Sequence, residues 1–397
     1  MQATLEREAL IVGNLDGLIW NLPHLLFRAG FAVDVVATST VLRASKFVRT
    51  MHHAHNISEL ARTAFDLICT RGEPYDWVIA GDDLTLRLLA NLSWPADRRP
   101  AYLSMDRAGE IDHIFSKIGL SQALAAGGVQ TPPYHIANDW REAAAWARRN
   151  GFPVMLKIDA SNGGLGVYEC NCVEDIEQLG CLFELGQVLA QKKIAGPEID
   201  VTAIYFDHQL VHFDYAQVVK VEGKFGPSVV RTYYPLPLVS VDVLAELSRL
   251  GTALRANGFS NISCIEAADG TGRYYFEADL RPNAWADYSR HFERDQAGRI
   301  RRWFDAGTCL TPESVAPQGA CTPVIIPCCL RMPLWDLIRN RYGVWKYIPF
   351  ADPRVTLQLL LRASIVRSIK AITPQALQRR IKDWRSRRNS RSQLSKR

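Results

Sequence analysis

Acidic side chains near residue 270 have the types and spacing of a metal site. In the segment YYFEADLRPN, residues 274 to 283, Glu277 and Asp279 are two apart, so a strand would place both carboxylates on one face, with Cα atoms about 7 Å apart. Glu266 lies in the preceding segment ISCIEAAD and would join them if the two segments form a hairpin through the turn GTGR. Three oxygen ligands suit Mg²⁺, or Mn²⁺ in its place. Exposed acidic pairs on edge strands are commoner than metal sites, so this alternative stays open.

Arg281 follows Asp279 by two residues and would continue along the same face. A guanidinium there could stabilise charge developing on a phosphoryl group beside the metal ion, because planar bidentate contact with phosphate is Arg chemistry. A salt bridge from Arg281 to one of the neighbouring acids is an equally good interpretation.

A glycine-dense loop follows a lysine in KIDASNGGLGVYE, residues 157 to 169. Gly163, Gly164 and Gly166 let the backbone approach a bulky anion closely, and the loop amides could cradle phosphate. In FPVMLKI, residues 152–158, apolar residues occupy every second position, and Lys157 stands between two of them. We therefore expect the Lys157 side chain on the strand face opposite to these apolar residues, near the start of the loop. The loop lacks the Gly-Lys-Ser/Thr of a P-loop, and a glycine loop alone is more often structural than catalytic.

The elements around these residues suggest an α/β and α+β protein of several units. Apolar runs at 9–13, 31–39 and 75–83, alternating with helical patterns, predict a parallel Rossmann-like domain over 1–108. Asp82 and Asp83 end its last run, where open α/β sheets bind ligands. Mixed strands and helices with antiparallel hairpins are expected over 109–305, and a mainly helical region over 306–375.

The order of the motifs resembles that of the ATP-grasp superfamily of ADP-forming ligases over roughly residues 110 to 290. The family's opening pattern is matched by SKIGLSQALAAGGVQTP, its second lysine by FPVMLKI, its flexible lid by SNGGLGV, its adenine linker by QKKIAGPEIDV, and its acidic hairpin by IEAADGTGRYYFEADLRP. Lys192 stands where many relatives have an acidic residue, and Asp279 replaces the usual Asn.

This resemblance implies a Rossmann-like domain that precedes an ATP-grasp fold, with ATP and Mg²⁺ as cofactors. It implies ADP-forming ligase activity, in which a small-molecule carboxylate is activated as an acyl phosphate and attacked by an amine or another nucleophile. A non-catalytic ATP-binding protein of the same fold is the alternative. The implied ATP-binding residues are Lys117, Lys157, Gly163, Gly164, Gly166, Gln191, Lys192, Ile194 and Glu198; the implied metal ligands are Glu266, Glu277 and Asp279, and Arg281 and Lys157 would be catalytic.

Charge and composition limit the other functions. The 397 residues carry a net charge of +6 and no uninterrupted apolar run long enough for a membrane span, and the nine cysteines are irregularly spaced, so we expect a cytoplasmic enzyme. Residues 376–397 form a basic tail with nine Lys or Arg and one Asp, which leaves about −2 for the rest of the chain. The tail could contact an anionic membrane surface weakly or be a solvated terminus, and it has no motif for sequence-specific nucleic-acid binding. The oligomeric state cannot be predicted from these features.

Overall fold

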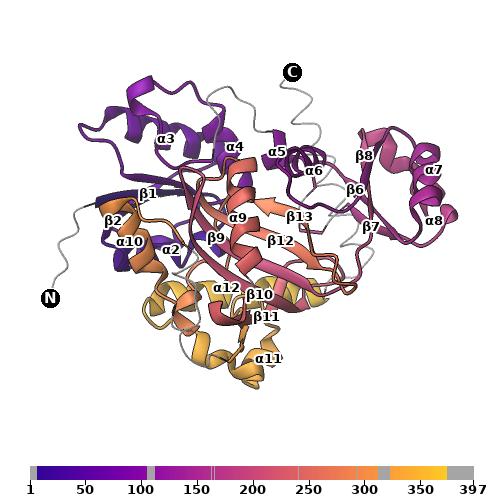
Figure 1. Ribbon diagram of the computed structural model, residues 1–397. Helices are drawn as coiled ribbons and strands as arrows, with labels where there is room; N and C mark the ends of the chain where they lie inside the picture. Colours follow the sequence, from indigo (N-terminus) through magenta and orange to yellow (C-terminus); the bar gives the residue numbers. More distant parts are fainter. Residues whose placement is uncertain are drawn as a thin grey trace.

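The computed structural model describes residues 7–104, 112–161, 163–164, 166–239, 241–292, 294–311 and 322–372. They form three sheets that lie side by side, and a group of helices near the C-terminus (Figure 1). The expected basic tail at 376–397 lies outside the described residues.

The first sheet is parallel, with strand order β3-β2-β1-β4. Its strands are β1 (Arg7–Gly13), β2 (Phe31–Ala37), β3 (Thr50–His53) and β4 (Trp77–Ala80). The helices α1 (Asp16–Ile19), α2 (Leu22–Arg28) and α3 (Ile57–Thr70) connect them, and α4 (Asp83–Ala90) follows β4. Because β1, β2 and β4 are buried on both faces, they read as continuous apolar runs, and these runs predicted the strands correctly.

A small antiparallel sheet, with order β5-β8-β6-β7, carries the glycine loop. Its strands are β5 (Tyr134–Ala137), β6 (Val154–Ile158), β7 (Val167–Cys170) and β8 (Val188–Lys192). The helices α7 (Trp140–Asn150) and α8 (Val173–Gln178) cover one face, where Val154 and Leu156 are fully buried against them. The other face, which carries Lys157, is turned toward the rest of the protein (Figure 1). Two helices, α5 (Asp112–Phe115) and α6 (Lys117–Ala126), precede this sheet.

The largest sheet has six strands in the order β13-β12-β9-β10-β11-β14. They are β9 (Glu198–Phe206), β10 (Gln209–Val221), β11 (Ser228–Tyr234), β12 (Gly258–Glu266), β13 (Arg273–Asp279) and β14 (Val324–Pro327). Helix α9 (Val241–Ala253) packs on one face, where Leu247 and Leu250 meet Val201 and Ile262 in a common core. The opposite face carries apolar side chains, among them Ile204 and Phe206, that pack with the core of the first sheet, and polar side chains such as Asp200.

The C-terminal part contains α10 (Gln296–Ala306), α11 (Leu334–Ile338), the 3₁₀ segment η7 (Arg341–Tyr347) and α12 (Pro353–Ile372). The expected helical character is confirmed, but β14 was not foreseen: this short strand completes the edge of the large sheet beside β11. Among the described residues, no helix is long and apolar enough to cross a membrane. The eight cysteines that the structure describes have free thiols.

Candidate functional site

Two rows of polar side chains cross the face of the large sheet that lies opposite α9. In the pairing of β9, β12 and β13, Glu277 lies opposite Ser263, which in turn lies opposite Asp200. Asp279 lies opposite Asn261 in the next row. Residues directly opposite in a ladder share a face, so the expected pairing of the Glu277 and Asp279 carboxylates on one face is confirmed.

Glu266, the third predicted metal ligand, does not lie on the same face as these two carboxylates. A β-bulge separates the pair Ser263–Glu277 from the pair Cys264–Tyr275, so β13 has one extra residue at this point. Glu266 consequently shares the face of Cys264, toward α9, where its Oε1 lies 3.4 Å from Nη1 of Arg273. Among the described residues, no three His, Cys, Asp or Glu side chains are grouped closely enough to hold a metal ion.

Lys157 stands on β6 and faces this acidic surface. Its side chain is 8% exposed, and its Nζ lies 4.8 Å from the ring centroid of Phe276, the extra residue of the bulge. Burial lowers the pKa of Lys157 to about 8; attraction by Glu277 and Glu198 opposes this effect, and repulsion by Lys117 adds to it. The small sheet and the hairpin of the large sheet therefore converge on one charged site.

Lys117 is brought to the same site by Asp159, the residue after β6 ends. Asp159 Oδ1 accepts hydrogen bonds from Ser116 Oγ at 2.7 Å and from the backbone N–H of Ile118 at 2.9 Å, which joins the start of α6 to the end of β6. The Nζ of Lys117 donates to the carbonyl of Ser161 in the glycine loop. Burial lowers the pKa of Lys117, while Glu277 and Asp279 oppose the shift.

Glu277 is exposed to water, although protein surrounds it in most directions. This enclosure raises its pKa to about 7, and the charge of Asp279 contributes to the rise. The pKa of Asp279 is also raised by burial, in spite of the nearby Arg281. Two carboxylates with raised pKa values indicate a place where an added cation would be stabilised.

Arg281 forms the salt bridge that the sequence left open, and it does so with two acids. Its Nη2 lies 2.8 Å from Asp279 Oδ2, and its Nε donates to Asp83 Oδ1 at 3.0 Å. Asp83 is the first residue of α4, so the first domain reaches the site directly. Its neighbour Asp82 instead caps α4 by accepting from the backbone N–H of Thr85 at 3.0 Å.

A buried ion pair lies beside these carboxylates. Arg231 Nη2 is 2.6 Å from Asp200 Oδ2, and Ser263 Oγ donates to Asp200 Oδ1 at 2.7 Å. Burial and the charge of Asp200 raise the pKa of Glu198 to about 7, while Arg231 and Lys157 moderate the rise. Sequence reasoning missed Asp200, although it stands two residues after Glu198 on one strand and so shares its face.

The glycine loop connects β6 and β7, and its Asn162 and Leu165 lie outside the described residues. Gly163, Gly164 and Gly166 have φ values of +61°, +73° and +76°, a region that favours glycine. A Cβ on Gly164 would lie 1.9 Å from the carbonyl oxygen of Phe225, in the turn between β10 and β11. The loop thus packs closely against a turn of the large sheet.

The expected adenine-linker residues lie where β8 leaves the small sheet for β9. Gln191 is 1% exposed, and its Nε2 donates to Ser121 Oγ at 3.1 Å, while its Oε1 is buried with no hydrogen-bond partner among the described residues. Lys192 is exposed and Ile194 is half-buried. Gly196 passes the end of β12 so closely that a Cβ would lie 1.9 Å from the carbonyl oxygen of Glu266.

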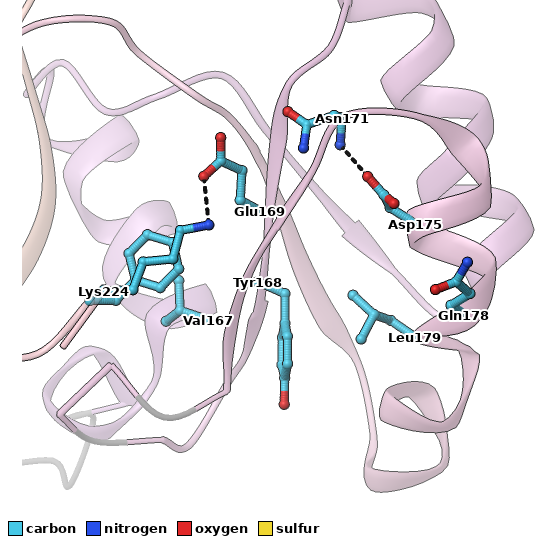
Figure 2. Close-up of a pocket in the computed structure, with 9 residues that line it drawn as sticks. Val167, Tyr168, Glu169, Asn171, Asp175, Gln178, Leu179 and Lys224 are labelled. Atoms are coloured by element: carbon cyan, nitrogen blue, oxygen red, sulfur yellow. Dashed lines mark hydrogen bonds and ion pairs between the residues drawn. The ribbon is translucent and has the colours of Figure 1, made fainter.

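A cavity of about 520 Å³ opens at the edge of the small sheet, and none of the expected site residues lines it (Figure 2). It lies between β7, α8 and the turn that carries Lys224 and Phe225. Two of the lining residues form an ion pair: Lys224 Nζ lies 3.1 Å from Glu169 Oε2. The dashed line in Figure 2 marks this contact. This cavity is separate from the charged site, which lies between the two antiparallel sheets.

No family model matches the chain, but comparisons of sequence and of structure find similar proteins. A biotin carboxylase from Halalkalibacterium halodurans is 26% identical over 181 residues, which are 42% of this chain and only 39% of that protein. The biotin carboxylase domain of Hydrogenobacter thermophilus 2-oxoglutarate carboxylase, solved with MgADP and bicarbonate, has a TM-score of 0.61 at 16% identity, covering 80% of this chain and 73% of the other.

A third relative is the N5-carboxyaminoimidazole synthetase of Staphylococcus aureus, solved with ADP. It has a TM-score of 0.61 at 12% identity and covers 86% of both chains. At these identities the likeness shows the fold alone. This chain therefore has the same fold as these solved enzymes.

Proposed function

We propose that this chain is an ADP-forming ligase that uses ATP and Mg²⁺ to activate a carboxylate for attack by an amine or another nucleophile. The observation that carries the proposal is the convergence of Lys117 and Lys157 with Glu277, Asp279 and Arg281 between the two antiparallel sheets. Such a set of charges suits a reaction in which two anions must be brought together.

The residues present fit a nucleotide. Lys117, Lys157 and the amides of the glycine loop would hold the phosphates, because their donors gather at the end of β6. The unpartnered Oε1 of Gln191 would accept a hydrogen bond from the adenine amino group, which the backbone at Lys192 and Ile194 would border. Glu198 would accept from the ribose hydroxyls.

Glu277 and Asp279 would hold Mg²⁺ without Glu266. When bound, ATP supplies the phosphoryl group, and Mg²⁺ neutralises part of the negative charge of the phosphates. The carboxylate oxygen of the substrate would bond to the γ-phosphorus as the bond to ADP breaks, and the incoming amine would then displace phosphate. In both steps Arg281 would orient the anionic group after exchanging one of its two carboxylate partners for substrate.

Nucleotide binding and ADP release by the purified chain test the proposal. We expect Mg²⁺-dependent ATP binding, and ADP formation with at least one acid and amine pair from a panel that includes bicarbonate and amino acids. Glu277→Gln should weaken Mg²⁺-dependent binding by about tenfold or more, since a metal ligand is lost. Glu266→Gln is the matched control and should change binding less than about twofold. ATP binding without ADP from any pair would favour the non-catalytic alternative.

A further inference from the structure

The C-terminal helices expose an unusual number of large apolar side chains. Trp335 is 69% exposed on α11, Trp345 is 53% exposed on η7, and Phe350 is 71% exposed just before α12. Leu334 and Ile338, on α11, are 41% and 52% exposed. Isolated exposed apolar residues are ordinary, but a group that includes two tryptophans and a phenylalanine marks an interaction surface.

Four of these residues lie on α11 and on the adjoining segment η7, and we call them the aromatic surface: Leu334, Trp335, Ile338 and Trp345. Trp345 is held against α11 because its Nε1 donates to the carbonyl of Leu337 at 2.7 Å. The indole N–H of Trp345 is therefore satisfied within the protein, while its ring is partly exposed to solvent.

Helix α12 adds a second apolar row in the same lobe of the molecule (Figure 1). Val355 and Leu359 bury one side of the helix against the first domain, whereas Leu357 and Leu361 are 59% and 55% exposed on another side. Residues four apart are neighbours on a helix, so Leu357 and Leu361 form a single ridge. The helix is thus apolar on two sides, only one of which is covered.

The charge of this part of the chain has one sign. Residues 331–397 contain 17 Lys or Arg and three Asp, a net charge of +14, so the preceding 330 residues carry −8. Among the described residues of this region, Arg339, Lys346 and Arg354 are exposed. The two acids, Asp336 and Asp352, are engaged: Asp336 lies 3.2 Å from Lys220 Nζ, and Asp352 accepts from Ser45.

We infer that the aromatic surface docks on an anionic membrane surface, with Trp335 and Trp345 inserted among the lipid headgroups and the surrounding Arg and Lys paired with lipid phosphates. Tryptophan rings flanked by cationic side chains are favoured at this boundary, where apolar and charged groups are both accommodated. The basic tail follows α12 directly in the sequence and adds attraction to the same anionic leaflet.

Charge argues against the two other occupants. A second copy of the chain would bring two regions of strong positive charge together, which like-charge repulsion disfavours. A nucleic acid would complement the charge but would leave Leu334, Ile338, Leu357 and Leu361 in contact with water or phosphate. A lipid surface, unlike these two occupants, offers both anionic groups and an apolar layer.

Vesicle co-sedimentation of the full-length chain tests this inference. We expect binding to phosphatidylcholine vesicles that contain about 30% phosphatidylglycerol and about tenfold weaker binding to pure phosphatidylcholine. Trp335→Glu/Trp345→Glu should weaken binding to the anionic vesicles by about tenfold or more, because two charges would enter the boundary. Leu185→Glu is the control: Leu185 is 71% exposed on the distant small-sheet lobe, and its change should alter binding less than about twofold.

Fluorescence quenching separates insertion from simple charge attraction. Lipids brominated on their acyl chains should quench the emission of the bound protein, and Trp335→Phe/Trp345→Phe should remove that quenching while vesicle binding persists. Binding that is insensitive to the Glu substitutions but lost on deleting residues 376–397 would overturn the inference. So would a dimer that Trp335→Glu/Trp345→Glu dissociates, or binding to RNA or DNA that these substitutions abolish while vesicle binding is absent.

Discussion

Arg281 Nε lies 3.0 Å from Asp83 Oδ1, although 198 residues separate the two in the chain. This contact joins the end of β13 to the first helix residue after β4, so the parallel domain takes part in the charged site. Arg281 also contacts Asp279. This ion pair links two parts of the fold at the proposed nucleotide site, so substitutions of its residues test both stability and function.

Asp83→Asn should destabilise the protein by about 1 to 2 kcal/mol, because a charge-assisted hydrogen bond is weakened while Arg281 keeps Asp279 as a partner. Arg281→Met should lower the free energy of unfolding by more than Asp83→Asn does, because it leaves Asp83 and Asp279 without their shared cation. Urea denaturation of the two single variants and the double variant measures the coupling. Additive effects of the two changes would contradict a direct interaction.

Stability without nucleotide should fall as the pH rises from about 5 to about 7. Glu277 and Glu198 have pKa values of about 7 in the folded protein, against 4.5 ordinarily, so over this range the folded state holds protons that the unfolded chain has released. Thermal melts across this window should show a shallower decline for Glu277→Gln. Saturating Mg²⁺ and ATP should reverse the slope, since binding requires the charged carboxylates; a flat wild-type profile would exclude the raised pKa values.

Gly164→Ala should destabilise the protein more than Gly163→Ala. Both glycines have a left-handed φ, which costs an alanine about 1 kcal/mol. Only Gly164 lies against another backbone, the Phe225 carbonyl, whereas nothing lies within 4 Å of a Cβ on Gly163. Denaturant midpoints of the two variants isolate this contact. Equal midpoints would mean that the loop does not rest on the turn between β10 and β11.

Lys157→Met should leave stability at pH 7 unchanged or higher, because it removes a buried charge whose pKa burial has already lowered to about 8. The same substitution should weaken ATP binding by about tenfold or more if Lys157 holds phosphate. Lys46→Met, at an exposed position outside the charged site, is the control and should change neither property appreciably. Calorimetric titration and thermal melts give both readouts, and unaltered ATP affinity in Lys157→Met would count against its role.

The sequence predicted the strands and the faces of their side chains, because these features depend on residues close together in the chain. The alternation of apolar residues in FPVMLKI places Lys157 opposite Val154 and Leu156, and those two residues are indeed buried under α7 and α8. The continuous apolar runs of the parallel strands and the order of the ATP-grasp motifs likewise predicted the fold. The spacing of Glu277 and Asp279 predicted their shared face because side chains alternate with a period of two.

Tertiary structure alone decided which acids belong to the site. Glu266 matched the motif, but β13 has one extra residue, Phe276, between the pairs that join it to β12. Because of this bulge, Glu266 and Glu277 lie on opposite faces of the sheet, and Glu266 is on the face of α9. A bulge has no reliable signature in the sequence of a single strand. Asp83 joins the site only through the packing of one domain on another, and Asp159 brings Lys117 close only because a carboxylate caps the start of α6. The sequence determined the elements and the chemistry they carry, whereas register and domain packing determined which charges meet, because those contacts depend on residues far apart in the chain.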